Sequence, residues 1–387
     1  MTNNKLKKVV LINQHTTYIF IDIINSFCKE YDEVVLVAGV VRPMAIPLDP
    51  KVKVVSIPMY NKKNIVTRII SWFLGFVKSV FLLNFYYRKH DVFVSTNPPL
   101  NNFITLFCKN KVSLLVYDVY PDGLIAAGFM TKNNLIYKIW ASLNRKAFKK
   151  FKSIVAITNG MAKLLSTYVE SSKILVVPAW ANQSLSNVND SNETNDFISK
   201  FNLKDKFLII YSGNLGIKHD LESLVELAKN LTEYKDIEVL IIGEGFKKSI
   251  IEDLINNYNI KNCQLLPYLP ANMFLSMLQA MQVGVVSLEK ETSQISIPSK
   301  TFNILGVGKP IICLGTKESD LAELLEINQA GMSFTSDSIE TLTSFVIKLY
   351  ADKNYYAQLT ENASKLSLKF SYKNADLILK DHLEKLI

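Results

Sequence analysis

The sequence predicts an α/β protein with two domains, each built on a parallel β-sheet. A chain of 387 residues exceeds one core of typical size, and 49% apolar against 20% charged residues indicate a globular protein. In both halves, short runs rich in Val and Ile alternate with helical patterns, which is typical of parallel sheets covered by helices. Between the halves, residues 182–196 are mostly polar and rich in turn-forming residues.

These observations set the expected domain boundaries. We expect an N-terminal domain at 1–181, a linker at 182–200 and a C-terminal domain at 201–366. A last helix, at 367–387, is expected to pack back on the N-terminal domain. Sheets of this kind bind ligands at the carboxyl ends of their strands, so functional residues are sought in the loops that follow the strands.

The elements follow in order, each strand being an apolar run ended by turn-forming residues. The strands expected in the first half cover 7–14, 33–39, 52–58, 91–97, 112–118, 153–159 and 174–180. The helices expected between them cover 19–31, 66–89, 134–151 and 160–169. The strands expected in the second half cover 207–213, 238–245, 263–270, 283–289 and 310–316. The helices expected there cover 221–232, 247–258, 273–281, 300–306 and 321–325.

The charge balance favours an anionic partner. Lys and Arg exceed Asp and Glu by nine, which suits phosphate-bearing substrates, an acidic membrane surface or nucleic acid. Nucleic acid is the weakest of these, because no recognised binding module accompanies the charge. The cysteines and histidines are too dispersed for a metal site. The apolar run before Asn13 is too short for a signal peptide, so we expect a cytoplasmic protein.

One apolar stretch, residues 69–87, is nearly long enough to span a bilayer. Lys78 lies at its centre, where a charge costs about 2.5–3.5 kcal/mol on insertion scales. We therefore predict a packed or interfacial helix and not a spanning one. The basic run 144–152 fits either a solvated helix face or contact with an anionic membrane surface.

Two glycine motifs follow expected strands. In YSGNLG, residues 211–216, Gly213 and Gly216 allow backbone N–H groups to approach a phosphate, and Lys218 adds a positive charge. In IIGEG, residues 241–245, the Glu244 carboxylate is placed to receive ribose or sugar hydroxyls. Neither motif is a GxGxxG fingerprint, so nicotinamide cofactors are not indicated.

The third motif is IPSKT, residues 297–301, followed by a helix and then GKP. Pro298 sets the turn, Ser299 or Thr301 can cap the helix, and Lys300 lies at its positive end. A helix start that combines hydroxyls with a lysine is suited to bind a diphosphate.

In this order and spacing, YSGNLG, IIGEG, LPYLP, PSK and GVGKPII resemble glycosyltransferase family 4. That family consists of retaining enzymes with the GT-B architecture, in which two Rossmann-like domains face each other across a cleft. STNPPL (95–100), VYDVYPDGL (116–124) and the run 144–165 resemble the branch that builds bacterial capsule and O-antigen repeats.

The resemblance implies roles for individual residues. The donor diphosphate is expected near the first glycine motif and the PSK segment, the base near Tyr268, and the acceptor near the loop 118–122. We assign catalytic roles to Lys218, Lys300 and Asp118. We assign substrate binding to Gly213, Asn214, Gly216, Gly243, Glu244, Gly245, Tyr268, Ser299, Thr301, Asn303, His15 and Asp122.

The sequence also departs from the family pattern. Many members have two glutamates separated by seven residues, where this chain has Ile295 and Asn303. Asn214 and His219 stand where an arginine and a lysine are usual, so Lys218 and Lys300 are the candidates to restore positive charge. Tyr117 precedes Asp118 where histidine is common, and the turn at His15 lacks the usual glycine pair.

The resemblance implies a retaining glycosyl transfer that needs no metal and no cofactor other than the nucleotide-sugar co-substrate, which we expect to be UDP-linked. The expected acceptor is an undecaprenyl-diphosphate-linked saccharide at the inner face of the plasma membrane, with the protein peripherally bound to this anionic surface and not to nucleic acid. Three alternatives stay open. They are a catalytically degenerate sugar-nucleotide-binding partner subunit, a nucleotide-sugar 2-epimerase and a membrane-binding scaffold.

Overall fold

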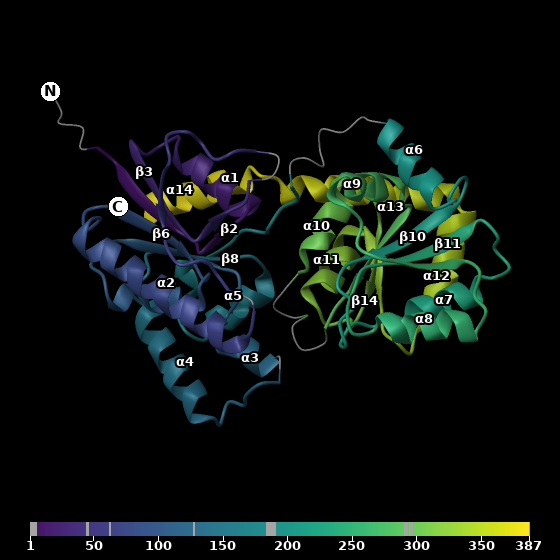
Figure 1. The fold of residues 1–387 in the computed structure, drawn as a ribbon, viewed down its shortest axis with the longest axis horizontal. Coiled ribbons are helices and arrows are strands. Elements are labelled where there is room, and N and C mark those ends of the chain that lie inside the picture. Colours follow the sequence, from purple (N-terminus) through teal and green to yellow (C-terminus); the bar gives the residue numbers. More distant parts are fainter. Residues whose placement is uncertain are drawn as a thin grey trace. The chain divides into compact units, whose positions relative to one another are not determined.

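The structure is a computed structural model that describes residues 6–43, 46–61, 63–126, 128–182, 191–289, 293 and 297–386. It divides into two compact units (Figure 1). Residues 1–183 and 372–387 form the first unit, and residues 184–371 form the second. Each unit contains a parallel sheet with its own core, so the predicted fold class, an α/β protein with two Rossmann-like domains, is confirmed.

The first unit is built on a seven-stranded sheet in the order β5-β3-β1-β6-β7-β8-β9. Every neighbouring pair is parallel. The bounds are β1 Lys8–Ile12, β3 Glu33–Ala38, β5 Lys53–Ser56, β6 Asp91–Ser95, β7 Val112–Val116, β8 Ile154–Ala156 and β9 Ile174–Val176. The central strands are runs of buried Val, Ile and Leu because helices cover both sheet faces. Two short strands, β2 His15–Thr16 and β4 Val40–Val41, pair separately.

Helices connect these strands and cover the sheet. They are α1 Tyr18–Phe27, α2 Ile65–Phe85, α3 Asp122–Ala126, α4 Leu135–Phe148, α5 Asn159–Leu165 and the 3₁₀ segments η1 Pro99–Leu106 and η2 Ser171–Lys173. Both α2 and α4 pack against η1.

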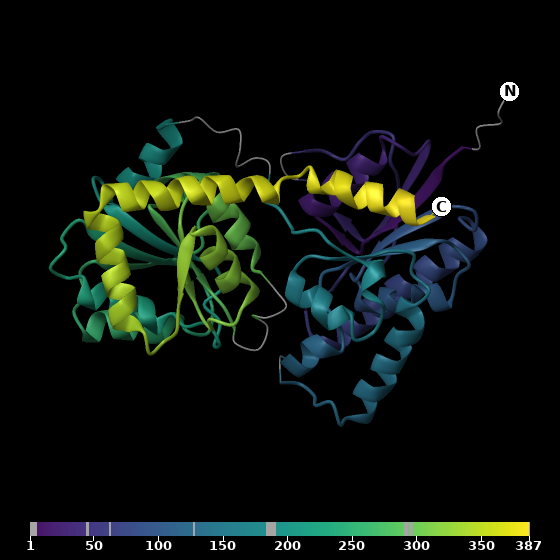
Figure 2. The same ribbon diagram turned by 180° about the vertical axis from the view of Figure 1, so that it is seen from behind.

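The last helix, α14 Asn374–Leu386, belongs to the first unit although it follows the second in sequence. It packs against α1, as the yellow and purple helices of Figure 2 show. His382 of α14 is fully buried, and its Nδ1 lies 2.7 Å from Ser113 Oγ of β7. Burial lowers the pKa of His382 to about 3, so this helix is attached by a neutral imidazole.

The second unit has a six-stranded sheet in the order β12-β11-β10-β13-β14-β15. The bounds are β10 Phe207–Ser212, β11 Ile237–Ile242, β12 Cys263–Leu266, β13 Val283–Ser287, β14 Ile311–Leu314 and β15 Gly331–Phe334. The chain moves outward from β10 to one edge, then returns to β13 and moves to the other edge. The strand order therefore reverses between β10 and β13, and such a switch point leaves a crevice at the carboxyl ends.

The helices of the second unit are α6 Ser191–Lys200, α7 Glu222–Asn230, α8 Lys248–Asn257, α9 Ala271–Ala280, α10 Ser299–Gly306, α11 Asp320–Asn328, α12 Ile339–Ala351, α13 Lys353–Ser367 and the 3₁₀ segment η4 Leu368–Phe370. Sequence patterns did not identify α12 and α13. They also placed the start of the last helix at 367, where the structure has the end of α13, a 3₁₀ turn and then α14.

The predicted linker at 182–200 is wrong in its second part. Residues 191–200 form α6, which packs against α9. Phe197 is fully buried there, and its ring lies 5.2 Å from that of Phe201. Polar composition suggested a loop, but one buried aromatic side chain is enough to attach a short helix, because tertiary packing supplies most helical stability.

Candidate functional site

The two glycine motifs of the second unit form one surface at the carboxyl ends of β10 and β11. The loop after β10 and the loop after β11 are joined by three backbone hydrogen bonds. Gly213 N–H donates to Ile242 O at 2.9 Å, Leu215 N–H to Glu244 O at 2.9 Å, and Lys247 N–H to Leu215 O at 3.0 Å. Sequence motifs that are 30 residues apart are thus one continuous structure.

Glycine is required where these loops meet. Gly243 has φ +155° and Gly245 has φ +152°, which side-chain-bearing residues rarely adopt. A Cβ on Gly243 would lie 1.8 Å from Gly213 O, and one on Gly245 would lie 2.6 Å from Leu215 O. Only residues without a Cβ allow the second loop to approach the first so closely.

Lys300, from the first turn of α10, reaches the same surface. Its Nζ lies 4.0 Å from the centre of the Tyr211 ring, and a Cβ on Gly213 would lie only 2.3 Å from this nitrogen. Gly213 and Lys300 therefore belong to one site, as the sequence motifs predict. Burial lowers the pKa of Lys300 to about 8. A desolvated ammonium on an aromatic face, beside a glycine loop, is suited to attract an anion.

The start of α10 offers further polar groups. Pro298 precedes the helix, and no side chain caps its start within the described part of the chain. Thr301 is fully buried, and its Oγ1 has no hydrogen-bond partner among the described residues. Asn303 Oδ1 is likewise buried without such a partner. Both residues lie close to Lys300 in the sequence of α10 and supply polar groups near the start of that helix.

His219 lies beside this group in the position where the resemblance leads one to expect a lysine. A Cβ on Gly216 would lie 3.1 Å from His219 Cδ2 and 2.9 Å from Asn214 Nδ2, so the two side chains flank that glycine. Burial lowers the pKa of His219 and the charge of Lys300 lowers it further, while the Glu289 carboxylate opposes them. The ring is therefore neutral near pH 7 and acts as a hydrogen-bonding group without charge.

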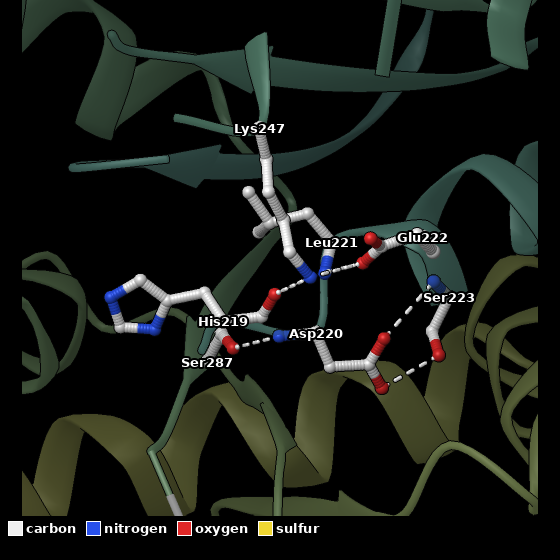
Figure 3. Close-up of polar contacts among 7 residues, drawn as sticks. All are labelled: His219, Asp220, Leu221, Glu222, Ser223, Lys247 and Ser287. Atoms are coloured by element: carbon white, nitrogen blue, oxygen red, sulfur yellow. Dashed lines mark hydrogen bonds and ion pairs between the residues drawn. The ribbon is translucent and has the colours of Figure 1, made fainter. Parts of the chain in front are cut away.

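Figure 3 shows how the His219 segment is held. Lys247 Nζ donates to His219 O at 2.6 Å and pairs with Glu222 Oε2 at 2.7 Å. Asp220 N–H donates to Ser287 Oγ at 3.0 Å. The Asp220 carboxylate in turn accepts from the N–H and hydroxyl of Ser223 at 3.3 and 2.7 Å, at the start of α7. The segment after Gly216 is thus attached to β13, α7 and the loop before α8.

Sequence reasoning missed several of these residues. The first motif includes Tyr211, but the sequence suggested no role for its ring. Sequence patterns also did not single out Lys247, Glu222 or Glu289. Lys247 follows the second glycine motif by two residues and Glu289 follows β13 by two residues, so their positions after strands were the available signal. The contacts themselves depend on side chains from different elements.

The other donor-side predictions have varied surroundings. The Glu244 carboxylate is paired with Lys248 Nζ at 2.9 and 3.0 Å, in a half-exposed i,i+4 ion pair. Tyr268 is half-exposed and lies near Tyr211. Burial is the larger cause of the raised pKa of Tyr211, and Tyr268 raises it further. Ser299 lies at the start of α10. Ile295 lies outside the described residues, so the first of the two replaced glutamate positions has no structural account.

Lys218 is exposed and lines an open hollow of about 640 Å³. The hollow is formed by residues that follow β13, β14 and β15, including Leu288, Thr316 and Lys317. Its lining contains neither Gly213 nor Lys300. A catalytic role for Lys218 beside Lys300 stays a prediction.

In the first unit, the predicted residues follow β1 and β7. Thr96 Oγ1, after β6, accepts from the N–H groups of Tyr117 at 3.0 Å and Asp118 at 3.3 Å. Gln14 N–H donates to Asn97 O at 2.8 Å. His15 N–H donates to Asn13 Oδ1 at 3.1 Å, after β1. The loops after β1, β6 and β7 are therefore linked at the carboxyl end of the first sheet.

The two acidic residues in this unit differ. Protein atoms around Asp118 raise the pKa of its carboxyl by desolvation, although the side chain still reaches solvent. Asp122 accepts hydrogen bonds from Tyr137 Oη at 3.0 Å and from the Tyr168 hydroxyl. The two Asp122 oxygens thus connect α3 to α4 and to Tyr168, which follows α5. Asp122 therefore has a structural role in addition to its predicted role in substrate binding.

Within the described ranges, no group of three or more His, Cys, Asp or Glu side chains could hold a metal ion. The site offers instead the buried ammonium of Lys300 beside the glycine loops, together with the start of α10. These groups can bind a diphosphate together with its neighbouring hydroxyl groups.

The fold and this site define the class of protein. Two units with parallel sheets, glycine loops and a lysine-bearing helix start at the carboxyl ends of the second sheet characterise a GT-B glycosyltransferase. Residues 192–366 match the family model described as glycosyl transferases group 1. The second unit belongs to that family, and the protein is a glycosyltransferase.

Known proteins that resemble the chain agree with this class. The chain is 26% identical over 334 residues to the glycosyltransferase WbjE of Pseudomonas aeruginosa. The aligned region covers 81% of this chain and 80% of WbjE. It is 23% identical over 238 residues to WcaI of Escherichia coli K12, covering 57% and 58% of the two chains. The name of WcaI assigns it to colanic acid biosynthesis. The structure of Anabaena HepE in complex with UDP has a TM-score of 0.70 at 11% identity and covers 98% of this chain and 100% of HepE.

Proposed function

We propose that this glycosyltransferase moves a sugar from a UDP-linked donor to a hydroxyl of a lipid-linked saccharide during surface polysaccharide assembly, with retention of configuration. The name of WcaI, one of the similar proteins, supports the polysaccharide context. HepE, which shares the fold, has been solved with UDP and with UDP-glucose, and this supports the choice of nucleotide. The membrane-linked acceptor follows from the sequence resemblance.

The observation that carries the proposal is the meeting of Lys300 with Gly213 over the Tyr211 ring. The donor diphosphate accepts from backbone amides of the loop after β10 and from the start of α10, with Lys300 as counter-charge. When the sugar leaves, negative charge accumulates on the diphosphate, and preorganised donors that stabilise this charge lower the barrier. The anion also favours the protonated form of Lys300, which burial alone disfavours.

Neutral groups around the ammonium fit the remainder of the donor. We assign Thr301 Oγ1 and Asn303 Oδ1, which have no hydrogen-bond partner among the described residues, to donor hydroxyls. Asn303 replaces a family glutamate, and an amide still accepts from a hydroxyl without contributing charge. His219 contributes a neutral hydrogen-bonding ring.

We assign the acceptor to the first unit, where Asp118 accepts a hydrogen bond from a hydroxyl next to the attacking one and so orients the acceptor. The raised pKa of Asp118 makes it a stronger hydrogen-bond acceptor than an ordinary aspartate. Retention is proposed to proceed through deprotonation of the acceptor by the departing phosphate on the same face. No resident metal takes part in this scheme.

The experiment is to measure UDP binding by calorimetry and sugar transfer by product analysis, each with and without EDTA. We expect UDP to bind and sugar to be transferred equally well in both conditions. A loss of activity in EDTA that is restored by a divalent ion would contradict the metal-free scheme. A protein that binds no uridine nucleotide would contradict the donor assignment.

A second candidate is a sugar-nucleotide-binding partner subunit without catalytic activity. Asn214 and Asn303, which stand where charged residues are usual, favour it. Such a subunit would bind UDP but would neither transfer nor hydrolyse a UDP-sugar, so the same two measurements distinguish it.

A further inference from the structure

Helix α2 of the first unit has its apolar side chains on the outside. Nine of them each expose 45% or more of their surface, and the six between positions 69 and 81 are defined here as the apolar face. They are Ile69, Ile70, Phe73, Leu74, Val77 and Phe81. Only 22% of the most apolar 18-residue window of α2 is buried. A soluble protein usually turns such a face toward its core, so an exposed surface of this size indicates an apolar partner.

The opposite face of α2 packs against the first unit, with small residues along the helix and with Leu82 and Leu83 near its end. Ser71, Gly75 and Ser79 are buried at spacings of four residues. Gln14 Nε2 donates to Ser71 O at 2.8 Å, and a Cβ on Gly75 would lie 2.7 Å from the same nitrogen. The helix is therefore held in its orientation by the first unit and cannot simply rotate its apolar side chains inward.

The orientation is also set at the helix start. Asn64 Oδ1 accepts from Thr67 N–H at 2.9 Å, and Asn64 N–H donates to Thr67 Oγ1 at 3.2 Å, which together form a capping box. Apolar residues thus begin directly after a well-defined cap, and the outward face is a property of an ordered helix.

Basic residues lie before, within and after α2. Residues 50–169 contain 18 Lys and Arg but only three Asp and Glu, a net charge of +15, whereas the whole chain carries +9. Lys63 precedes α2, Lys78 lies within it, and Arg88 and Lys89 follow it, all exposed. A second copy of the chain docked on this face would bring these positive charges together, which disfavours self-association.

We propose that the apolar face of α2 docks the protein on an anionic lipid bilayer, with the helix lying in the plane of the interface. An apolar helix face bordered by Lys and Arg is the pattern of interfacial helices on anionic membranes. This inference deepens the proposed function, because it identifies the surface that would bring the enzyme to a lipid-linked acceptor.

The topology decides between lying on the bilayer and crossing it. Among the described helices, α2 alone is long and apolar enough to cross. However, α2 connects β5 to β6, which belong to the same parallel sheet, so it runs alongside that sheet. A spanning α2 would place the sheet and its polar loops in the hydrocarbon, where unpaired backbone groups cost several kcal/mol each. The helix therefore inserts only its outward side chains.

The first test replaces apolar side chains without changing charge. The variant Phe73→Ser, Val77→Ser, Phe81→Ser is compared with the unaltered full chain in sedimentation with vesicles of equal parts phosphatidylcholine and phosphatidylglycerol. We expect the partition coefficient to fall at least about tenfold, because the variant lacks three apolar side chains that would be buried in the lipid. The matched control, Ile327→Ser, Leu368→Ser, Leu377→Ser, removes apolar side chains elsewhere that are as exposed or more so, and should bind like the unaltered protein.

The second test concerns charge. The variant Lys78→Gln, Arg88→Gln, Lys89→Gln should lose about tenfold or more in binding to the same vesicles. Lys204→Gln, Lys235→Gln, Lys261→Gln makes the same change in net charge at exposed positions of the second unit, and should lose much less. Equal losses in both charge variants would show unspecific attraction and overturn the assignment to α2.

Two other outcomes would also overturn the proposal. One is that the unaltered chain fails to bind the anionic vesicles. The other is a concentration-dependent dimer in sedimentation velocity that the serine variant abolishes, which would identify the face as a contact between copies. Thermal unfolding shows whether each variant is folded. UDP affinity, measured separately, should be unchanged in the serine variant, so failure of the transferase proposal is distinguishable from failure of the docking surface.

Discussion

The carboxyl ends of the two sheets have the same position in the fold but different chemistry. In the second unit, two glycine loops joined backbone to backbone meet the buried ammonium of Lys300. In the first unit, one backbone hydrogen bond from Gln14 to Asn97 and the hydroxyl of Thr96 join the corresponding loops, with Asp118 as the acidic residue. The proposed function makes use of this difference, with the anionic donor assigned to the second unit and the hydroxyl-bearing acceptor to the first.

The reason lies in what each loop can bring close to a ligand. Glycines at 243 and 245 allow the main chains of two loops to come into contact beside Lys300. In the first unit, the Thr96 hydroxyl connects the loop after β6 to Asp118, so a polar side chain takes part in the junction. Four changes test this comparison.

The largest effect is expected for Lys300→Ala. Loss of the buried charge beside Gly213 should lower kcat/KM about 10²–10³-fold, as removal of one preorganised donor typically does. The control is Lys309→Ala, a lysine that burial also perturbs but that lies at the amino end of β14, away from the carboxyl ends. If Lys309→Ala reduced activity as much as Lys300→Ala, the site would not depend on Lys300 in particular.

Gly243→Ala should affect both stability and binding. The new Cβ meets Gly213 O and the residue keeps a φ of +155°, so we expect a loss of about 1–3 kcal/mol in the free energy of unfolding. UDP affinity should fall with it, because the loop after β10 must move. Gly123→Ala in the first unit is the control, since its Cβ would meet no atom within 4 Å. Unchanged UDP affinity in folded Gly243→Ala would separate the loop junction from donor binding.

Asp118→Asn tests the first unit. The amide keeps the size of the side chain but is a poor proton acceptor, so we expect kcat to fall about tenfold with UDP affinity unchanged. The two readings together locate the effect on the acceptor side. Weaker UDP binding in this variant would contradict the division of tasks between the two units.

The smallest effect is the pH dependence of UDP binding. Burial lowers the pKa of Lys300 to about 8, so in the free protein this residue loses its charge as pH rises through that value. UDP affinity should therefore decrease a few-fold toward about pH 9. Lys300→Met should bind UDP more weakly, and its affinity should change less with pH. A decrease of the same slope in Lys300→Met would assign the titration to another group.

The same pKa has the opposite effect on stability. Because the folded-state pKa of Lys300 lies below the ordinary value of 10.5, the unfolded chain binds more protons between about pH 8 and 10.5. The contribution of this lysine therefore makes the folded protein more stable as pH rises through that range, while UDP binding weakens. Comparison of unfolding curves for the unaltered protein and Lys300→Met isolates this contribution.

Sequence patterns identified the features that depend only on neighbouring residues. Runs such as VVLI in β1 and LIIY in β10 mark strands because a residue buried on both sheet faces must be apolar. Glycines after those strands and the lysine after Pro298 mark the binding loops, since the required conformation and charge belong to single positions. These features needed no knowledge of distant residues.

Polar segments and long-range contacts were less accessible. Composition assigned the segment around Phe197 to a linker, but the buried Phe197 side chain anchors it as a helix. Asp122 was predicted to bind substrate, and its carboxylate accepts hydrogen bonds from Tyr137 and Tyr168. The last helix joins the first unit through contacts such as His382 with Ser113, across 269 positions of the chain. In each case the outcome depends on a partner that is remote in sequence.

The sequence by itself thus determined most of the strands, many of the helices, the glycine loops and the lysine at the start of α10, because hydrophobic periodicity and backbone freedom act over a few residues. Only the tertiary structure decided that Lys300 lies on the Tyr211 ring against Gly213, and that α2 turns many of its apolar side chains away from the core. Those arrangements depend on packing between elements that are distant in sequence, which no local pattern records.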